Sequence, residues 1–274
     1  MFIAEIGINH NGSLETAFEL IKQAKEAGAD VVKFQKRTPE ICVPEEQKNV
    51  IKESSFGTTT YLEYKKLMEF EKEEFDKIDA FCKGIDIKWT ASVWDIPSVE
   101  FLMQYDVPFI KIPSALMTHT ELLQKVNEYK KPVIISNGAL TDDELDDAIM
   151  MLEDCELTIL ICNSSYPSND NDLNLNYLKT LKDRYSYCTI GYSGHELDML
   201  PTLVAKSMGC DVIERHITLD KNAIGSDHKA SLNIQELKAL IQALARIDII
   251  KGDDIKVITE AEEKVMAKLR YYSK

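Results

Sequence analysis

The sequence predicts a single α/β domain of the (β/α)8 type, a TIM barrel. Eight short apolar stretches, each with the length of a buried strand, alternate with eight stretches of helical spacing. Such alternation is typical of a parallel sheet covered by helices. Eight strands close a barrel, and about 250 residues is its usual size. A doubly wound sheet is disfavoured, because no G-x-G-x-x-G fingerprint follows the first apolar stretch.

The first strand and helix follow the pattern clearly. Residues 2–8 form an apolar run, and the turn signal Asn9-His10-Asn11-Gly12 ends it. Ser13 is placed to cap a helix whose apolar residues repeat every three or four positions, and Gly28 is the expected stop. A second buried strand is expected over residues 30–35.

A polar insertion between Lys36 and Thr58 interrupts the regular alternation. It contains Pro39 and Pro44 and is longer than a connection between a strand and a helix requires. We keep two interpretations of it, a functional lid and plain surface decoration. A long, highly charged helix is then expected over residues 61–82.

The remaining strands and helices alternate without another long interruption. Strands are expected at residues 87–93, 109–113, 132–135, 157–162, 187–192 and 211–214. Helices are expected after Pro97 and at residues 121–129, 142–152, 175–184, 199–208 and 234–250. We therefore expect residues 1–252 to form the barrel and residues 253–274 to form a C-terminal helical tail.

The composition narrows the choice of partners and compartments. A net charge of −14, with acidic residues spread along the helices, argues against nucleic acid or an anionic membrane as a partner. The six cysteines show no C-x-x-C spacing, which favours a reduced, cytoplasmic setting. Because a strand-like run begins at Phe2, we expect no signal peptide, and no apolar run reaches about 18 residues. We expect small-molecule substrates, and a homo-oligomer is compatible with the sequence.

Two histidines stand at the ends of neighbouring predicted strands. His195 follows the strand at residues 187–192, and His216 follows the next strand along the chain. Because adjacent parallel strands lie roughly 5 Å apart, the two imidazoles can share one divalent metal. A lone histidine at a strand end is more often a hydrogen-bonded structural residue. The pair, with Glu214 and Asp227 close by in the sequence, favours a metal site.

Every predicted strand ends in polar residues, and in a barrel these ends form one rim that carries the active site. Lys33 and Lys111 suit a phosphate and a carboxylate, and hydroxyl groups supply further donors. Glu5 lies within a buried strand, so its carboxylate needs a role in the site or a structural ion pair. The rim residues are Glu5, Asn9, His10, Lys33, Gln35, Thr90, Ser92, Lys111, Ser114, Ser136, Asn137, Asn163, Ser164, Tyr166, Ser193, His195, Glu214 and His216.

Several long motifs occur in the order of a known family. They are IAEIGINHNG, AGADVVKFQ, KIPS, KPVIIS, GYSGH and ERHITLD followed by GSD. On these motifs, from Phe2 to about Leu232, the chain resembles the sialic acid (N-acetylneuraminate) synthase family. That family condenses phosphoenolpyruvate with an N-acetylhexosamine-type aldose to give a nonulosonic acid and phosphate. We expect a short member that lacks the family's C-terminal antifreeze-like domain, because the chain stops at Lys274.

The resemblance implies roles for individual residues. His195 and His216 match the two histidines that bind the metal, usually Mn²⁺ or Mg²⁺. Glu5, Glu214 and Asp227 match catalytic positions. The matching substrate-binding positions are Lys33, Gln35, Ser92, Lys111, Ser114, Ser136, Ser164, Tyr166 and Ser193.

The acceptor sugar stays open at this point. An N-acetylmannosamine-like aldose is the first expectation, and a different or phosphorylated sugar is the alternative within the same chemistry. A catalytically silent barrel that binds a metabolite is the alternative from another class. The presence of both histidines, both lysines and Glu5 argues against a silent barrel.

Overall fold

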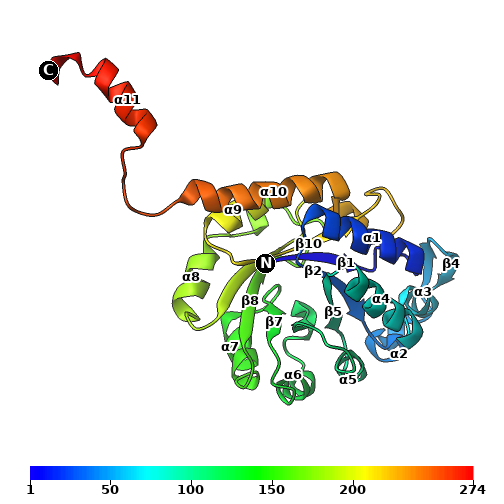
Figure 1. The fold of residues 1–274 in the computed structure, drawn as a ribbon. Helices are drawn as coiled ribbons and strands as arrows, with labels where there is room; N and C mark the ends of the chain where they lie inside the picture. Colours follow the sequence, from blue (N-terminus) through cyan, green and yellow to red (C-terminus); the bar gives the residue numbers. More distant parts are fainter. Residues whose placement is uncertain (274) are drawn as a thin grey trace.

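Eight parallel strands close on themselves in the computed structural model, which describes residues 1–273 (Figure 1). Each strand pairs with the next in chain order, and the last pairs with the first. The predicted (β/α)8 barrel is therefore confirmed. Its strands are β1 (Phe2–Gly7), β2 (Val31–Lys36), β5 (Lys88–Val93), β6 (Ile110–Ile112), β7 (Val133–Ser136), β8 (Leu157–Cys162), β9 (Thr189–Gly194) and β10 (Val212–Thr218).

Helices surround the strands and bury one apolar face each. In α1 (Leu14–Ala27), the Ser13 hydroxyl accepts a hydrogen bond from the Thr16 N–H at the start. Gly28 ends this helix with φ of 98°, a left-handed conformation that glycine adopts without strain. The other helices of the outer ring are α4 (Lys72–Gly84), α5 (Ile96–Leu102), α6 (Thr120–Asn127), α7 (Asp142–Met151), α8 (Tyr177–Arg184), α9 (Leu200–Ser207) and α10 (Ile234–Lys251).

A separate apolar layer fills the inside of the barrel. Its side chains come from inward-facing positions of the strands or from the residue just before a strand, and all are buried. They are Ile3, Val31, Phe109, Ile134, Leu160 and Val212. This layer closes the barrel below the site, because a side chain two residues further along each strand points to the same side.

The helix expected over residues 61–82 is two helices, and that expectation is wrong. α3 (Tyr61–Met68) ends before Glu69, and α4 begins at Lys72. The Glu69 carboxylate instead lies 2.9 Å from Nε of the buried Arg37. The Lys36 ammonium group donates a hydrogen bond of 2.9 Å to the Phe70 carbonyl. The chain turns here because two buried cations from β2 and the residue after it need these oxygens.

The insertion after β2 has its own secondary structure. It contains α2 (Pro39–Cys42) and an antiparallel hairpin of β3 (Ile51–Ser54) and β4 (Gly57–Thr60). The hairpin leads directly into α3, and Tyr61 N–H donates to the Val50 carbonyl at 2.8 Å. α5 also differs slightly from expectation, since Pro97 lies in its first turn after the Asp95 cap.

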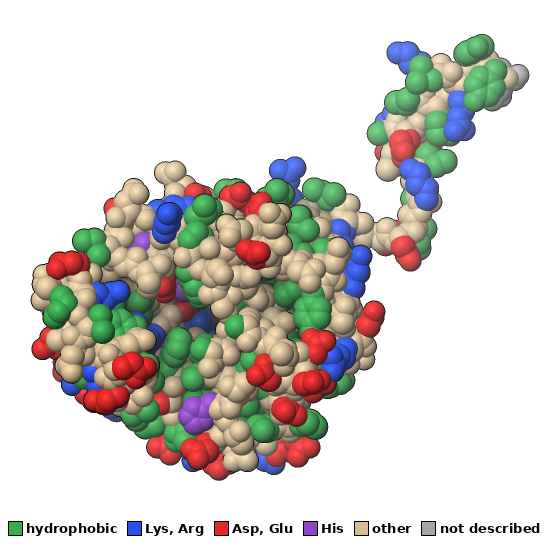
Figure 2. All heavy atoms as spheres, turned by 180° about the vertical axis from the view of Figure 1, so that it is seen from behind, with side chains coloured by type: hydrophobic (Ala, Val, Ile, Leu, Met, Phe, Trp, Pro, Cys, Tyr) green, Lys and Arg blue, Asp and Glu red, His purple; other side chains and the backbone are tan. Residues whose placement is uncertain are grey.

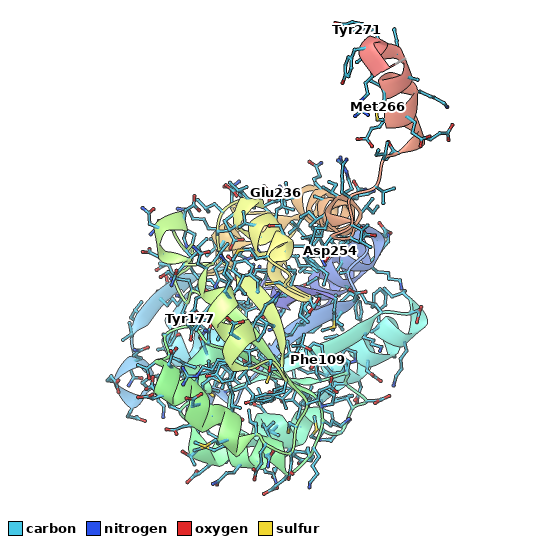
Figure 3. All side chains as sticks on the ribbon, turned by 90° about the vertical axis from the view of Figure 1, so that its left-hand side faces the viewer. Phe109, Tyr177, Glu236, Asp254, Met266 and Tyr271 are labelled. Atoms are coloured by element: carbon cyan, nitrogen blue, oxygen red, sulfur yellow. The ribbon has the colours of Figure 1, made fainter. Side chains whose placement is uncertain are left out.

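The end of the chain leaves the barrel. After α10, residues 252–259 lead to α11 (Glu260–Leu269), which stands away from the rest of the molecule (Figures 1 and 3). The short strand β11 (Leu232–Asn233) pairs with β10 just before α10. Across residues 1–273, no helix has both the length and the apolar character needed to cross a membrane.

Candidate active site

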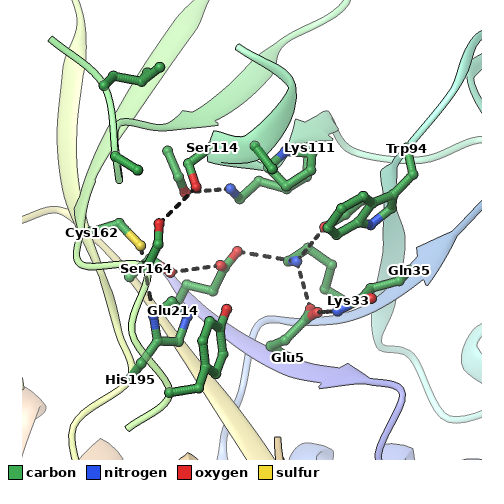
Figure 4. Close-up of a pocket in the computed structure, with 18 of the residues that line it drawn as sticks. Glu5, Lys33, Gln35, Trp94, Lys111, Ser114, Cys162, Ser164, His195 and Glu214 are labelled. Atoms are coloured by element: carbon green, nitrogen blue, oxygen red, sulfur yellow. Dashed lines mark hydrogen bonds and ion pairs between the residues drawn. The ribbon is translucent and has the colours of Figure 1, made fainter. Parts of the chain in front are cut away.

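Inward-facing strand positions change from apolar to polar two residues beyond the apolar layer. Above that layer a cavity of about 410 Å³ opens at the carboxyl ends of the strands (Figure 4). Figure 2 shows a hollow near the middle of this face, with lysine or arginine atoms at its floor. All predicted site residues except Asp227 line this cavity: Glu5, Lys33, Gln35, Ser92, Lys111, Ser114, Ser136, Ser164, Tyr166, Ser193, His195, Glu214 and His216.

Lys33 occupies the centre of the buried charges. Its ammonium nitrogen lies 2.7 Å from Glu5 Oε2 and 3.6 Å from Glu214 Oε2. It also donates to the Ser92 hydroxyl at 2.7 Å. All three charged side chains are buried. The ion pair that the sequence left as one interpretation of Glu5 is thus present, and it lies inside the cavity.

The two carboxylates beside Lys33 differ in their affinity for protons. Burial raises the pKa of Glu5 to about 7, although Lys33 acts in the opposite direction. Burial would also raise the pKa of Glu214, but Lys33 and Lys111 outweigh it and hold that pKa at about 2. Glu214 is therefore ionised at neutral pH, whereas Glu5 can gain or lose a proton there.

Lys111 is a buried cation without a carboxylate partner. Its ammonium group donates to the Ser136 hydroxyl at 2.5 Å and to the Ile112 carbonyl at 3.3 Å. No ion pair with Lys111 occurs within residues 1–273, and burial lowers its pKa. Beside it, the hydroxyls of Ser114 and Ser164 lie 3.1 Å apart. A buried cation surrounded by hydroxyl groups is suited to an anionic ligand.

The two histidines lie side by side at the carboxyl ends of the paired strands β9 and β10. Their ring centroids are 5.5 Å apart. His195 Nδ1 lies 2.7 Å from the Asn163 carbonyl, so this nitrogen donates and Nε2 is left as an acceptor. Burial lowers the pKa of His195 to about 4 and also lowers the pKa of His216. Both rings are therefore neutral near pH 7.

Two neutral imidazoles fit a divalent metal in part. His216 Nδ1 is buried and finds no hydrogen-bond partner among residues 1–273, and Asp227 Oδ2 lies 3.9 Å from it. Within the described chain, no three His, Cys, Asp or Glu side chains group closely enough to hold a metal ion by themselves. A metal held by the two histidines would therefore take its other ligands from water or substrate.

Some predicted rim residues have structural contacts instead. The Asn9 side chain donates to the Ile217 carbonyl at 2.9 Å and to the Ser231 hydroxyl at 2.8 Å. The His10 ring stacks on Phe70, with centroids 4.1 Å apart. Neither residue lines the cavity, because both lie in the turn beyond the end of β1.

Several residues that line the cavity were not among the predicted site residues. They are Trp94, Pro113, Ala115, Thr118, Ala139, Leu140, Glu144 and Cys162. Trp94 directly follows β5, so reading one residue further at that strand end would have found it. Glu144 lies in the first turn of α7, where an examination of strand ends cannot detect it. Cys162, at the end of β8, lies under His195 with its sulfur 3.8 Å from Nδ1.

A buried ion pair connects the loop after β9 to β10. Arg215 is completely buried and donates to Glu196 Oε1 at 2.7 Å and to the Glu196 carbonyl at 2.7 Å. The hydroxyls of Tyr192 and Thr202 donate to the same carboxylate. Glu196 follows His195 in the chain, and Arg215 precedes His216. The ion pair therefore fixes the two backbone segments that carry the histidines.

Comparisons with known proteins identify the family of the chain and its fold. A family model described as the NeuB family matches residues 20–256. The N-acetylneuraminate-9-phosphate synthase of Drosophila melanogaster is 38% identical over 252 residues, which cover 90% of this chain and 68% of that protein. The N,N′-diacetyllegionaminic acid synthase of Campylobacter jejuni is 33% identical, with coverage of 96% and 81%.

A solved structure has the same fold over nearly the whole chain. It is the N-acetylneuraminic acid (sialic acid) synthetase of Leptospira borgpetersenii in complex with citrate. Its TM-score is 0.86 at 29% sequence identity, with coverage of 98% of this chain and 92% of that one.

Proposed function

The chain belongs to the NeuB family, and on this premise we propose that it condenses phosphoenolpyruvate with an aldose to give a nonulosonic acid. The methylene carbon of phosphoenolpyruvate forms a bond with the aldehyde carbon. Water adds to the neighbouring carbon, and the C–O bond to phosphate breaks, which releases inorganic phosphate. The named synthases among the relatives support this reaction class.

The observation that carries the proposal is the pair of buried lysines at the cavity floor. Phosphoenolpyruvate carries a phosphate and a carboxylate, and Lys33 and Lys111 supply two fixed positive charges among hydroxyl donors. Lys111 has no carboxylate partner within residues 1–273, so an incoming anion would supply its missing counter-charge. Cations held in place before the substrate arrives need no reorganisation during the reaction.

The two histidines would position the acceptor sugar through a bound metal ion. His195 and His216 would hold a divalent ion, Mn²⁺ or Mg²⁺, through neutral ring nitrogens. Such an ion, when bound, polarises a carbonyl oxygen as a Lewis acid. The Tyr166 ring contacts the His195 ring at a tilt of 31°, with centroids 3.9 Å apart, and would form a wall of the acceptor site.

The two buried carboxylates would have different roles: Glu214 would position Lys33, and Glu5 would transfer a proton. Glu214 stays ionised and, with Ser193 donating to it at 2.9 Å, holds Lys33 in the cavity. Glu5 would take up or release a proton near neutral pH, because its pKa of about 7 suits both directions. A group of this kind is needed where water adds to the reacting carbon.

The test is a phosphate-release assay with phosphoenolpyruvate, Mn²⁺ and a panel of aldoses, with mass spectrometry of the product. We expect phosphate release that depends on the aldose and on the metal, and a product mass equal to pyruvate plus the aldose. Lys111→Ala should weaken phosphoenolpyruvate binding while Mn²⁺ binding, followed by electron paramagnetic resonance, changes little. Phosphate release at the same rate without any aldose would contradict the proposal.

A further inference from the structure

Arg37 is a buried arginine that contacts two residues of the cavity wall without lining the cavity itself. It follows β2 directly and is 6% exposed. Its guanidinium donates a hydrogen bond to Gln35 Oε1 and lies 4.5 Å from the centre of the Trp94 ring. Gln35 and Trp94 both line the cavity, and Arg37 does not. The Arg37 side chain therefore supports this part of the wall from outside.

A buried carboxylate fixes the Arg37 side chain. Glu69 Oε1 lies 2.9 Å from Arg37 Nε, and Glu69 Oε2 accepts a hydrogen bond of 3.2 Å from the Arg37 backbone N–H. The Glu69 side chain is buried as well. A guanidinium is planar and carries its donors in a rigid fork. With Nε paired with Glu69, the terminal nitrogens have a fixed direction, and one of them contacts the Gln35 amide.

The contacts of the Gln35 amide determine which of its two ends is the oxygen. A guanidinium only donates hydrogen bonds, so the amide atom that faces Arg37 must be the oxygen. On the other side, Gln35 Nε2 donates to Glu5 Oε1 at 3.5 Å (Figure 4), and an ionised carboxylate only accepts. Both neighbours therefore require the same orientation. The amide has two N–H groups and Glu5 takes at most one, so the other can donate to a ligand.

Trp94 supplies a second donor on the neighbouring strand. It directly follows β5, which pairs with β2. Its Nε1–H is buried and has no hydrogen-bond partner within residues 1–273. Buried N–H groups normally have a partner, so a ligand oxygen is the expected one here. The Arg37 guanidinium lies over the ring and keeps the indole in place.

The position of Gln35 along β2 separates its amide from the two lysines. Gln35 lies two residues beyond Lys33, so both side chains point into the barrel and Gln35 is nearer the mouth of the cavity. In the proposed reaction, Lys33 and Lys111 bind the phosphate and the carboxylate of phosphoenolpyruvate. The donors of Gln35 and Trp94 are therefore left for the aldose.

We propose that Arg37 is a positioning residue for the acceptor sugar. It holds the Gln35 amide with its N–H groups toward the cavity, where they bind a hydroxyl or carbonyl oxygen of the aldose. The inference rests on the proposed function and adds a residue that determines how the acceptor is held. Arg37 acts through Gln35 and Trp94 and does not touch the substrate.

The test replaces Arg37 in two ways that differ in their effect on stability. Arg37→Lys keeps a positive charge beside Glu69 but lacks the planar fork that reaches Gln35, whereas Arg37→Met also removes the charge. We expect both variants to raise the KM for N-acetylmannosamine about threefold to tenfold, because one oriented hydrogen bond is lost. The KM for phosphoenolpyruvate should stay unchanged, since Lys33 and Lys111 are untouched. Thermal melting should separate the two variants, with Arg37→Met melting well below Arg37→Lys.

A double-mutant cycle with Gln35→Leu tests whether Arg37 acts through the amide. In the Gln35→Leu background, Arg37→Lys should cause little further rise in the KM for N-acetylmannosamine. Arg184→Lys is the matched control, because it makes the same replacement at a guanidinium that pairs with Asp142 and Asp146 on α7. It should leave both KM values unchanged. If N-acetylmannosamine is not turned over, the most active aldose of the panel takes its place.

The orientation of the amide can also be measured without turnover. The side-chain 1H–15N signals of Gln35, identified by their absence in Gln35→Leu, should shift or broaden in Arg37→Lys and stay unchanged in Arg184→Lys. An unchanged KM for the aldose in Arg37→Lys would overturn the inference and leave the proposed function standing. A KM that rises only in Arg37→Met would do the same, because the effect would then follow stability. If no aldose supports phosphate release, the proposed function fails, and Gln35 signals that are identical in Arg37→Lys and wild type would overturn the inference as well.

Discussion

Glu5 forms an ion pair with Lys33 and nevertheless has a pKa near neutrality. The raised pKa indicates that burial destabilises the ionised carboxylate more than the attraction to Lys33 stabilises it. Lys33 also keeps Glu214 as a second partner when the Glu5 charge is removed. Glu5 therefore contributes little to folding through its charge.

We accordingly predict that Glu5→Gln folds with a melting temperature close to that of the wild type and turns over at least about 100-fold more slowly. This factor is the lower range for a group that transfers a proton. Thermal melting and phosphate release are to be measured on one preparation. A variant that melts much earlier but turns over normally once folded would identify Glu5 as a structural partner only.

His10 illustrates a polar residue that serves the fold. It is buried between Phe34 and Phe70, and its Nδ1 accepts a hydrogen bond from the Gly12 N–H at 3.1 Å. Burial lowers the pKa of His10 to about 3. The unfolded chain takes up a proton at this residue near pH 6.5, whereas the folded chain does not.

This difference makes the fold sensitive to acid. The stabilising contribution of neutral His10 is complete above about pH 6.5 and is lost as the pH falls toward 3. Between pH 7 and pH 5 the loss should be about 2 kcal/mol of unfolding free energy. Urea denaturation of wild type and His10→Gln at both pH values measures it. The two proteins should differ less at pH 5 than at pH 7, and a constant difference would contradict the assignment.

At the scale of elements, the Glu196–Arg215 ion pair connects β10 with the loop after β9. Arg215→Met leaves the Glu196 carboxylate buried without its counter-charge, so we predict a loss of about 3–5 kcal/mol in unfolding free energy. The double variant Arg215→Met/Glu196→Gln should be more stable than the single Arg215→Met. Urea denaturation of the full cycle measures the coupling. Strictly additive effects would mean that the two residues act independently.

The break between α3 and α4 is also caused by buried charges, which lie at the end of β2 and directly after it. Local sequence over residues 61–82 favours one continuous helix, since it contains neither Pro nor Gly. The break follows from Arg37 and Lys36, which lie more than thirty positions earlier and draw in the Glu69 carboxylate and the Phe70 carbonyl. The sequence of residues 61–82 by itself contains no information about partners so far away in the chain. The β3–β4 hairpin was missed for a related reason, because its polar residues do not alternate with apolar ones.

At the scale of the whole molecule, the sequence predicts the barrel because each strand must be apolar on both faces below the site. The site residues at the strand ends were predictable for the same reason. Lys33 and Glu214 are recognisable in the sequence because they follow buried apolar residues of the same strands, such as Val31 and Val212. Glu144 could not be found in this way, because the fold brings a helix to the cavity.

The layered interior of the barrel has a consequence for how such a chain can change over generations. Along several strands one residue belongs to the apolar layer, and the residue two positions later belongs to the site, as with Ile3 and Glu5 or Phe109 and Lys111. Stability and chemistry are therefore encoded at separate positions of the same strand. Selection can change the site residues while the apolar layer keeps the barrel folded. Directed evolution of acceptor preference should accordingly find tolerated changes in the hairpin and rim far more often than in the apolar layer.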